Sequence, residues 1–426
     1  MKKTAQVCFL SVSITVPAVA FGAGFALNEQ STRTLGQAFA GRVSDADNAS
    51  TLASNPAGMS FLDRAEVSAG FSFIDAHSDI SQTSSTAAGL NVSGGNDGDI
   101  IPFSTVPFGY YVQPLDDHWA AGIGIYAPFG LTTDNKGEFQ GRYFGTKSNI
   151  KAIALQPTLS YKFDNGLALG LGVTYNRFDG KLQKDIFVAP TLGDIHATVS
   201  GDDTAWGYNI GLLYQLDEQT RIGLTYYSKV DYKLKGYTSL HNLPTALLGT
   251  PSLRFDASLD IETPERIDFG ITHQLTPQLT LHADISRTDW STLKEIRVEN
   301  HGAPAAFAES VEPLKWKASM LYSVGASYQL NSQWRVRGGI GFDEQPVPDS
   351  TRSVRLPAGD RTLLSIGTTW TPLQNLDIDA AYMYIQEETV HVNQQQAALV
   401  TNLPVSYNAK YNTSVNLLSL QASWRF

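Results

Sequence analysis

The last residues of the chain, TSVNLLSLQASWRF from 413 to 426, alternate apolar and polar side chains and end on an aromatic residue. Successive side chains of a β-strand point to opposite faces. One face therefore carries Leu418, Leu420, Ala422, Trp424 and Phe426, and the other carries Leu417, Ser419, Gln421, Ser423 and Arg425. Strands of outer-membrane barrels turn such an apolar face to lipid and a mixed face to the lumen. A transmembrane β-barrel is therefore the leading interpretation.

Similar alternation recurs along the rest of the chain. The stripes run over 67–73, 106–112, 121–125, 153–163, 167–175 and 206–214. Tight turns such as Asp164-Asn165-Gly166 and Asp217-Glu218 interleave with much longer connections, which is the rhythm of short periplasmic turns and long external loops. Beyond the first residues, no segment approaches the roughly 18 uninterrupted apolar residues of a membrane helix.

The rhythm of the connections also sets the strand count. Residues 253–262 and 265–274 would be two strands if they were split at Pro264. A short link would then stand where a long loop is due, so we interpret 253–274 as one strand with an irregularity at the proline. The count becomes an even 14, with both ends on the periplasmic side. The predicted fold is an all-β, 14-stranded antiparallel transmembrane barrel.

The start of the chain has the pattern of a secretory leader. Lys2 and Lys3 precede an apolar run from 7 to 19, and Ala20-Phe21-Gly22 offers small residues at a cleavage site. We expect a signal peptide over 1–22 and a mature start at Ala23. Cys8, the one cysteine, falls in the leader, so no disulfide or thiol chemistry is expected. The net charge of −10 argues against a nucleic-acid partner.

Residues 23–64 do not fit a barrel wall. They are rich in Gly, Ala, Ser and Asn, show short helical spacing around 34–40, and lack a strand-length alternation. We interpret this segment as an N-terminal plug, or hatch, that fills the lumen, and residues 65–426 as the barrel. A disordered periplasmic extension is the alternative that composition leaves open.

Several motifs stand in order along the expected mature chain. They are AGFALNEQ at 23–30, SNPAGMS at 54–60, YYSKVDYKLKG at 226–236, TDWSTL at 288–293 and GFDEQPVPDSTRSVRLPAGDR at 341–361. Together they resemble the FadL family of outer-membrane long-chain fatty acid transporters, which includes TodX-like aromatic hydrocarbon channels. The resemblance covers essentially the whole mature chain, and it implies that Asn55, Pro56, Ala57 and Gly58 form the hatch motif.

The resemblance further implies an exit for substrates through the barrel wall, where the third strand is kinked. Here that strand runs from 121 to 129 and meets Gly130, with Pro128 just before it. Proline removes a ladder donor and glycine weakens a strand, so a break in pairing is physically reasonable there. The alternative is that Pro128 and Gly130 merely open the following loop.

Two of the expected external loops carry unexpected apolar content. Ile186, Phe187, Val188, Ala189, Leu192 and Ile195 lie in one, and Leu240, Leu243, Ala246, Leu247 and Leu248 lie in the other. Exposed apolar patches commonly mark binding surfaces, and the family has a hydrophobic docking groove between its loops. We expect Phe187, Val188, Leu243, Leu247 and Leu248 to form that groove. The alternative is that the loops pack on each other to cap the barrel.

A pocket for an acyl carboxylate should place a cation at the end of an apolar slot. By strand parity Lys315 and Lys317 point inward, and Lys184 aligns with a basic family position that contacts the ligand head group. Phe25 lies in the stretch that reaches the pocket in the family, and Phe129 lies beside the kink. The alternative for each lysine is pairing with an acidic neighbour.

No enzymatic chemistry is expected. The eight histidines are scattered without metal-ligand spacing, so neither a metal nor a cofactor is predicted, and a lipase-like Ser-His pair has no serine to single out. The expected protein is a monomer of the Gram-negative outer membrane. It would contact lipid and lipopolysaccharide and pass hydrophobic molecules by diffusion. An adhesin or phage-receptor barrel remains the non-transporting alternative.

Overall fold

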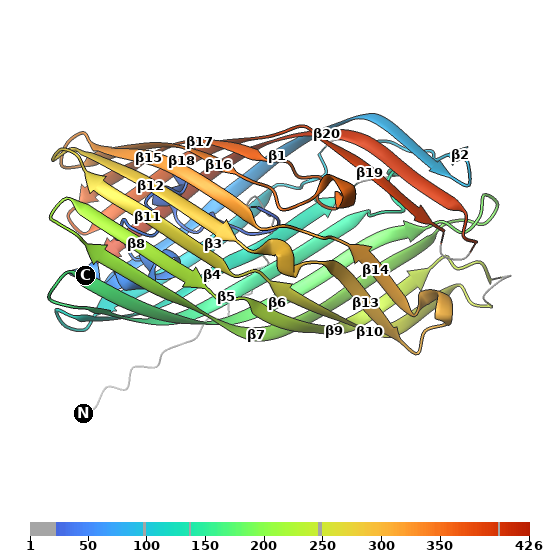
Figure 1. Cartoon of the computed structure of the whole chain (residues 1–426), viewed down its shortest axis with the longest axis horizontal. Coiled ribbons are helices and arrows are strands. Elements are labelled where there is room, and N and C mark those ends of the chain that lie inside the picture. Colours follow the sequence, from blue (N-terminus) through green and yellow to red (C-terminus); the bar gives the residue numbers. More distant parts are fainter. Residues whose placement is uncertain (1–22, 97–98, 136–137, 246–248, 399–400) are drawn as a thin grey trace, which may run out of the picture.

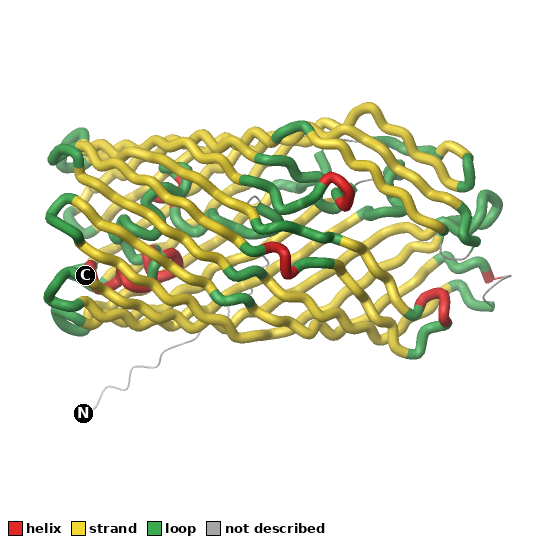
Figure 2. Tube along the Cα trace, viewed as in Figure 1, coloured by secondary structure: helices red, strands yellow, loops and turns green. Residues whose placement is uncertain are grey.

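The computed structural model describes residues 23–96, 99–135, 138–245, 249–398 and 401–426, and it is a long barrel of tilted antiparallel strands (Figures 1 and 2). The strands are β1 (Glu66–Ala87), β2 (Leu90–Asn91), β3 (Ser104–Pro114), β4 (Trp119–Asp134), β5 (Lys147–Lys162), β6 (Leu167–Ile186), β7 (Ile195–Gln215), β8 (Thr220–Tyr227), β9 (Val230–His241), β10 (Ser252–Thr263), β11 (Arg266–Gln274), β12 (Leu279–Thr288), β13 (Glu295–His301), β14 (Glu309–Pro313), β15 (Ser319–Gln329), β16 (Trp334–Asp343), β17 (Arg361–Leu373), β18 (Leu376–Glu387), β19 (Val390–Ala397) and β20 (Pro404–Arg425). The short helices are α1 (Thr32–Leu35), α2 (Thr51–Ser54), η1 (Pro56–Phe61), η2 (Trp290–Thr292), η3 (Ala305–Phe307) and η4 (Asp349–Thr351).

These strands build the 14 antiparallel segments of the barrel wall that were predicted, and each such segment is here called a stave. Several staves consist of two consecutive strands, because β8 and β9 both pair with β7, and β18 and β19 both pair with β20. β10 and β11 are likewise one stave with an interruption at Pro264 and Glu265. The interpretation of 253–274 as one irregular strand is therefore confirmed. The β13–β14 hairpin extends the β12–β15 pair beyond the main wall.

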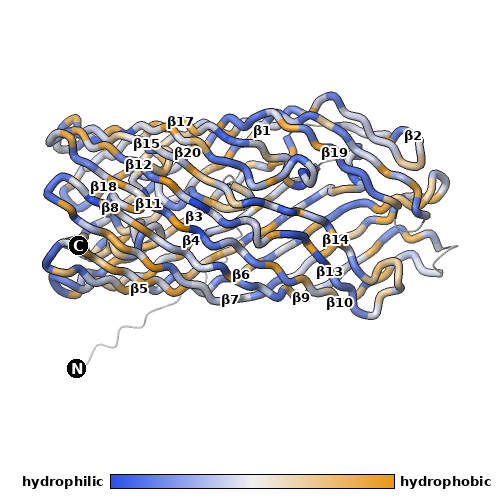
Figure 3. Tube along the Cα trace, in the orientation of Figure 1, coloured by the Kyte–Doolittle hydropathy of each residue, from blue (hydrophilic) through white to orange (hydrophobic). Residues whose placement is uncertain are grey.

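The first and last strands close the barrel. β1 pairs antiparallel with β20 from Glu66↔Arg425 to Ala87↔Val405. On β20, Leu418 and Leu420 are 47% and 45% exposed on the outer face, whereas Leu417 is fully buried on the inner face. The predicted parity of the terminal strand is thus confirmed, and hydrophobic and hydrophilic residues alternate along the wall (Figure 3).

The two ends of the barrel differ in their connections. Six short links, at 115–118, 163–166, 216–219, 275–278, 330–333 and 374–375, lie at the end that also holds the C-terminus (Figure 1). The longer connections lie at the other end, where the β13–β14 hairpin projects. Among the described residues, no helix is long and apolar enough to cross a membrane.

The residues before β1 lie inside the barrel. η1 packs on β5, β6 and β7, while α1 packs on β17, β18 and β20. Nearly every residue from 23 to 60 is buried. Because the helices are only a few residues long, their positions depend on contacts with the wall rather than on helix propensity. The predicted leader, 1–22, lies outside the described residues.

Candidate functional site

The wall has an irregularity in β4. Pairing between β3 and β4 runs from Pro114↔Ala120 to Gly109↔Ile125 and stops there. On its other side β4 pairs with β5, with a register shift between Tyr126 and Phe129. The strand then continues to Asp134. Pro128 and Gly130 therefore do not simply open a loop, and the irregularity falls at Ala127 and Pro128.

The N-terminal segment covers this irregularity. The N–H of Leu27 donates to the Pro128 carbonyl and the N–H of Gly130 donates to the Phe25 carbonyl, each at 2.9 Å. These bonds satisfy backbone groups that β3 no longer pairs. The first described residues thus act as a short substitute strand beside β4.

Four aromatic side chains meet behind the irregularity. The Phe25 ring lies 5.7 Å from Phe129, 4.8 Å from Trp290 and 5.9 Å from Trp316, measured between centroids. Gly24, at φ +66, lies so close to both indoles that a Cβ there would clash with them. The glycine therefore allows Phe25 to sit among the tryptophans. The two predicted ligand residues Phe25 and Phe129 are brought together.

The motif at 55–58 anchors the other end of the segment. The Asn55 side-chain oxygen accepts from the Ala57 N–H at 3.1 Å, and its amide donates to Leu212 O of β7 at 3.1 Å. Pro56 occupies the first turn of η1, where its missing N–H costs nothing. Gly58 packs against the Thr51 side chain. The four motif residues therefore hold η1 against the wall.

Wall glycines match this motif. A side chain at Gly170 of β6 would strike the Pro56–Ala57 backbone, and one at Gly211 of β7 would strike Asn55. These two glycines therefore allow the N-terminal segment to approach the wall closely.

Buried charges join the segment to the opposite wall. Arg33 contacts Asp377 at 2.7 Å, Asp379 at 3.1 Å and Asp47 at 3.0 Å. Burial by itself raises the pKa of Asp47, but Arg33, Arg337 and Arg335 outweigh it and lower that pKa to about 2. Elsewhere in the segment, burial raises the pKa of Glu29 to about 7.

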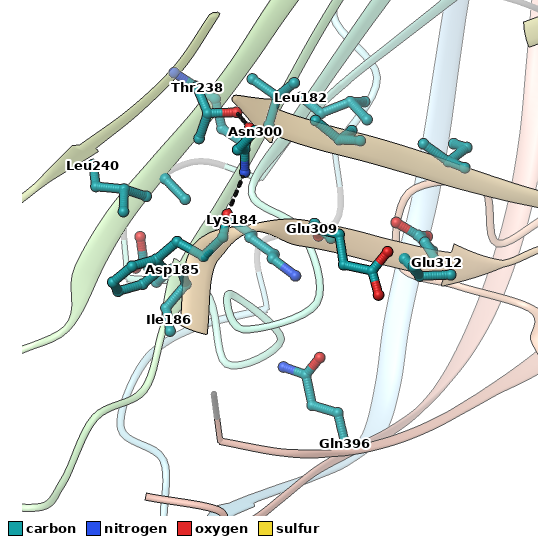
Figure 4. A pocket seen from close by; sticks show the side chains of 18 of the residues that line it. Leu182, Lys184, Asp185, Ile186, Thr238, Leu240, Asn300, Glu309, Glu312 and Gln396 are labelled. Atoms are coloured by element: carbon teal, nitrogen blue, oxygen red, sulfur yellow. Dashed lines mark hydrogen bonds between the residues drawn. The ribbon is translucent and has the colours of Figure 1, made fainter. Parts of the chain in front are cut away.

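A cavity of about 220 Å³, here called the outer cavity, lies toward the long-loop end (Figure 4). Strands β6, β7, β9, β13 and β14 supply most of its walls, and most of the lining side chains are apolar. The lining includes Leu182, Lys184, Phe187, Val199, Ile296 and Val298.

Lys184 gives the outer cavity a free positive charge. The other lining charges are paired, because Arg355 contacts Glu312 at 3.2 Å and Glu309 contacts Arg297 at 2.5 Å. Among the described residues, no carboxylate lies within ion-pair distance of Lys184. Figure 4 shows its amine directed into the same space as the Glu309 side chain. The arrangement is an apolar slot with one uncompensated cation.

Two smaller cavities continue from the outer cavity toward the N-terminal segment. The middle cavity, about 40 Å³, shares Leu182, Val199, Ile296 and Val298 with the outer one. The inner cavity, about 80 Å³, is lined by Ala26, Pro128, Phe129, Tyr232 and Arg266 among others. Phe178 of the middle cavity packs 4.9 Å from Tyr232 of the inner one, between ring centroids. Three cavities therefore lie between the long-loop end and the β4 irregularity, and the packed rings of Phe178 and Tyr232 stand between the middle and the inner one.

Lys315 and Lys317 do not point inward as strand parity predicted. Both are exposed, and neither lines a described cavity, whereas Leu314 and Trp316 are buried. The strand begins only at Ser319, and Lys315 has a positive φ of 50°. The alternation of β15 does not extend to this irregular stretch before the strand, so Trp316 is buried where a lysine was expected.

The predicted docking residues are also arranged differently. Val188 and Leu243 belong to one buried cluster that joins both loops, and Phe187 packs on Tyr143 and lines the outer cavity. All three are under 10% exposed. The two loops therefore pack on each other at Val188 and Leu243, whereas Phe187 packs on Tyr143 of another connection. Leu247 and Leu248 lie outside the described residues.

Some residues at the site were not singled out by sequence reasoning. Trp290, Trp316, Arg266 and Arg355 all line the passage or its aromatic cluster. Trp290 and Arg355 lie within motifs that carry the family resemblance, which was the available signal. The described residues contain no group of His, Cys, Asp and Glu suited to a metal.

Comparisons with known proteins agree with this architecture. Outer membrane protein P1 of Haemophilus influenzae is 28% identical over 100% of both chains. The long-chain fatty acid transport protein of Escherichia coli K12 is 29% identical over 88% of this chain and 90% of its own. The crystal structure of a Pseudomonas aeruginosa FadL homologue superposes with a TM-score of 0.86 at 24% identity, covering 95% of this chain and 100% of that chain.

The family described as outer membrane protein transport protein (OMPP1/FadL/TodX) matches residues 13–426. This match spans the N-terminal segment, the barrel and every cavity described above. The chain is therefore an outer-membrane β-barrel that belongs to the OMPP1/FadL/TodX family of transport proteins.

Proposed function

We propose that this protein is a passive outer-membrane channel for long-chain fatty acids or similar hydrophobic compounds. The ligand enters at the long-loop end, passes the three cavities and leaves sideways through the wall between β3 and β4. No catalytic step, cofactor or energy source of its own is involved. The observation that carries the proposal is the outer cavity, an apolar slot in which Lys184 has no acidic partner within ion-pair distance in the described part of the chain.

The charge of Lys184 favours a ligand with an acidic end. A buried or half-buried ammonium without a counter-charge is costly, and a carboxylate compensates it while the alkyl chain fills the apolar walls. Several relatives are named long-chain fatty acid transport proteins, and this supports the substrate class.

The lateral exit is inferred from the wall. Where β3 and β4 no longer pair, residues 25–27 bond to β4 in place of a strand. We propose that residues 23–64 act as a hatch, and that its first residues move away from Pro128 and Gly130 to release ligand. That movement would break these two backbone hydrogen bonds, the hydrogen bond from Gln30 Nε2 to the Ala127 carbonyl at 3.1 Å and the packing of Phe25 on the tryptophans, while Arg33 and Asn55 anchor other parts of the hatch.

Uptake of radiolabelled oleate by a deletion strain tests the proposal. Restoring the gene should restore uptake, and Lys184→Gln should weaken oleate binding to the protein in nanodiscs about ten-fold, as loss of one charge-assisted contact predicts. Lys181→Gln is the matched control, because Lys181 lies on the same strand but is exposed on the other face. Unchanged uptake with and without the gene would refute the channel, and toluene transport without oleate transport would assign it to aromatic compounds.

A further inference from the structure

The inner cavity, like the outer one and unlike the middle one, has polar as well as apolar lining residues. Besides apolar groups it is lined by Gln30, Asn176, Asn209, Thr263 and Arg266. It lies between the β4 irregularity on one side and the interruption at Pro264 on the other. A purely apolar cargo would not interact favourably with an arginine at this depth, whereas a ligand with an acidic end would.

Arg266 belongs to a cluster with an excess of positive charge. Its Nε lies 3.1 Å from Asp268 Oδ2, and the same oxygen lies 3.2 Å from Arg42 Nη2. One fully buried carboxylate thus serves two guanidinium groups. In the described part of the chain, Asp284 forms no ion pair with either arginine, and its oxygens accept the N–H groups of Gly41 and Val43.

The remaining contacts of Arg266 hold it in position without neutralising it. Its guanidinium carbon lies 4.0 Å from the centroid of the Tyr227 ring, and its Nη1 lies 3.4 Å from Asn28 Oδ1. Stacking on an aromatic ring and a weak bond to an amide leave further N–H donors on Arg266, because a guanidinium has five, and Arg266 lines the cavity. A planar carboxylate matches such a fork in a bidentate manner.

The other wall of the cavity suits an alkyl chain. Ala26, Pro128 and Phe129 line it on the side of the β4 irregularity. A volume of about 80 Å³ holds a head group and only the first few methylenes. The rest of a long chain therefore extends past Phe129, toward the place where β3 and β4 separate.

We propose that the inner cavity is a second head-group subsite, in which Arg266 binds the carboxylate of the fatty acid while the chain leaves first through the wall. This inference rests on the proposed function and adds an order to it. Lys184 receives the carboxylate at the outer cavity, and Arg266 holds it during exit. In tail-first release the alkyl chain enters the lipid while Arg266 still binds the carboxylate.

The test compares an acid with its neutral analogue in the full-length protein. Initial uptake of radiolabelled oleate and oleyl alcohol is measured in the deletion strain carrying wild type, Arg266→Gln, Arg266→Lys or Asn28→Ala. Arg266→Gln should lower the ratio of oleate to oleyl alcohol uptake about ten-fold, and Arg266→Lys should recover most of it. Asn28→Ala, which removes a hydrogen-bond acceptor of Arg266 but leaves its charge, should lower the ratio less than Arg266→Gln does.

Two outcomes separate the failure of the subsite from that of the channel. If wild type takes up no oleate above the empty strain, the proposed function fails. If wild type takes up oleate but Arg266→Gln changes both uptakes equally or neither, the channel stands and the subsite is wrong. Heat-dependent gel mobility of each variant verifies that the barrel is folded.

Discussion

Replacing Arg33 by methionine tests whether the N-terminal segment is held as a plug by buried charge. Arg33 is 6% exposed and contacts three aspartates, two of which belong to the wall. Methionine keeps much of the volume and removes the charge and every hydrogen bond. We predict that the N-terminal segment leaves its position inside the barrel more often, while the strands of the wall stay paired.

The magnitude follows from the charges that remain. Removal of one member of a buried ion pair costs about 3–5 kcal/mol. Asp377 keeps Arg425 at 2.9 Å, and Asp47 keeps Arg335 and Arg337 at 3.6 Å. Because these arginines still balance the aspartates, the cost should lie near the lower limit, about 3 kcal/mol. That corresponds to roughly a hundred-fold larger population of the unseated segment.

Conductance in planar bilayers measures that population. Arg33→Met should raise the frequency of large openings about a hundred-fold over wild type. Arg177→Met is the control, since Arg177 is 54% exposed and its pairs with Asp179 and Asp202 lie on the outer surface, where such pairs contribute about 0–1 kcal/mol. Equal opening frequencies in wild type and Arg33→Met would refute the reasoning.

Two further predictions concern pH and the lipid face. Burial raises the pKa of Glu29 to about 7 from 4.5, so the stability associated with its neutral form is fully present below about pH 4.5 and is lost as pH rises through 7. At pH 8 the free energy of unfolding of Glu29→Gln should therefore exceed that of wild type by up to about 3 kcal/mol, and at pH 4 the two should be equal. A gain of the same size at both pH values would contradict this. Leu420→Arg, on the exposed face of β20, should cost about 2–4 kcal/mol in urea unfolding from liposomes, whereas Leu115→Arg in a short turn should cost little; equal costs would mean that Leu420 does not face lipid.

The sequence pattern was most reliable where the backbone is regular. On β20 and on the paired part of β15, alternation correctly separated outer from inner residues, because each side chain's face follows from its neighbours two positions away. Lys315 and Lys317 show the limit of that argument. They lie before the first residue of β15, Ser319, where the alternation of the strand does not apply, and no local pattern in the sequence marked that boundary.

The sequence also could not show which distant segments of the candidate site come together. Motifs named the segments that meet, including Phe25, Pro128 and Trp290, but not their partners. The apolar content of Phe187, Val188 and Leu243 predicts a docking groove, but hydropathy does not show which loops cover one another. The structure buries them.

The sequence by itself therefore determined the terminal strand's faces, the count of 14 staves and the irregularity at Pro264, since these depend on period-two spacing and turn residues. Only the tertiary structure decided which charges meet. Arg33 reaches Asp379 and Arg42 reaches Asp268 because closure of the barrel brings distant strands around one buried segment. Ion pairs of this kind have no local signature, and their positions exist only once the barrel has closed.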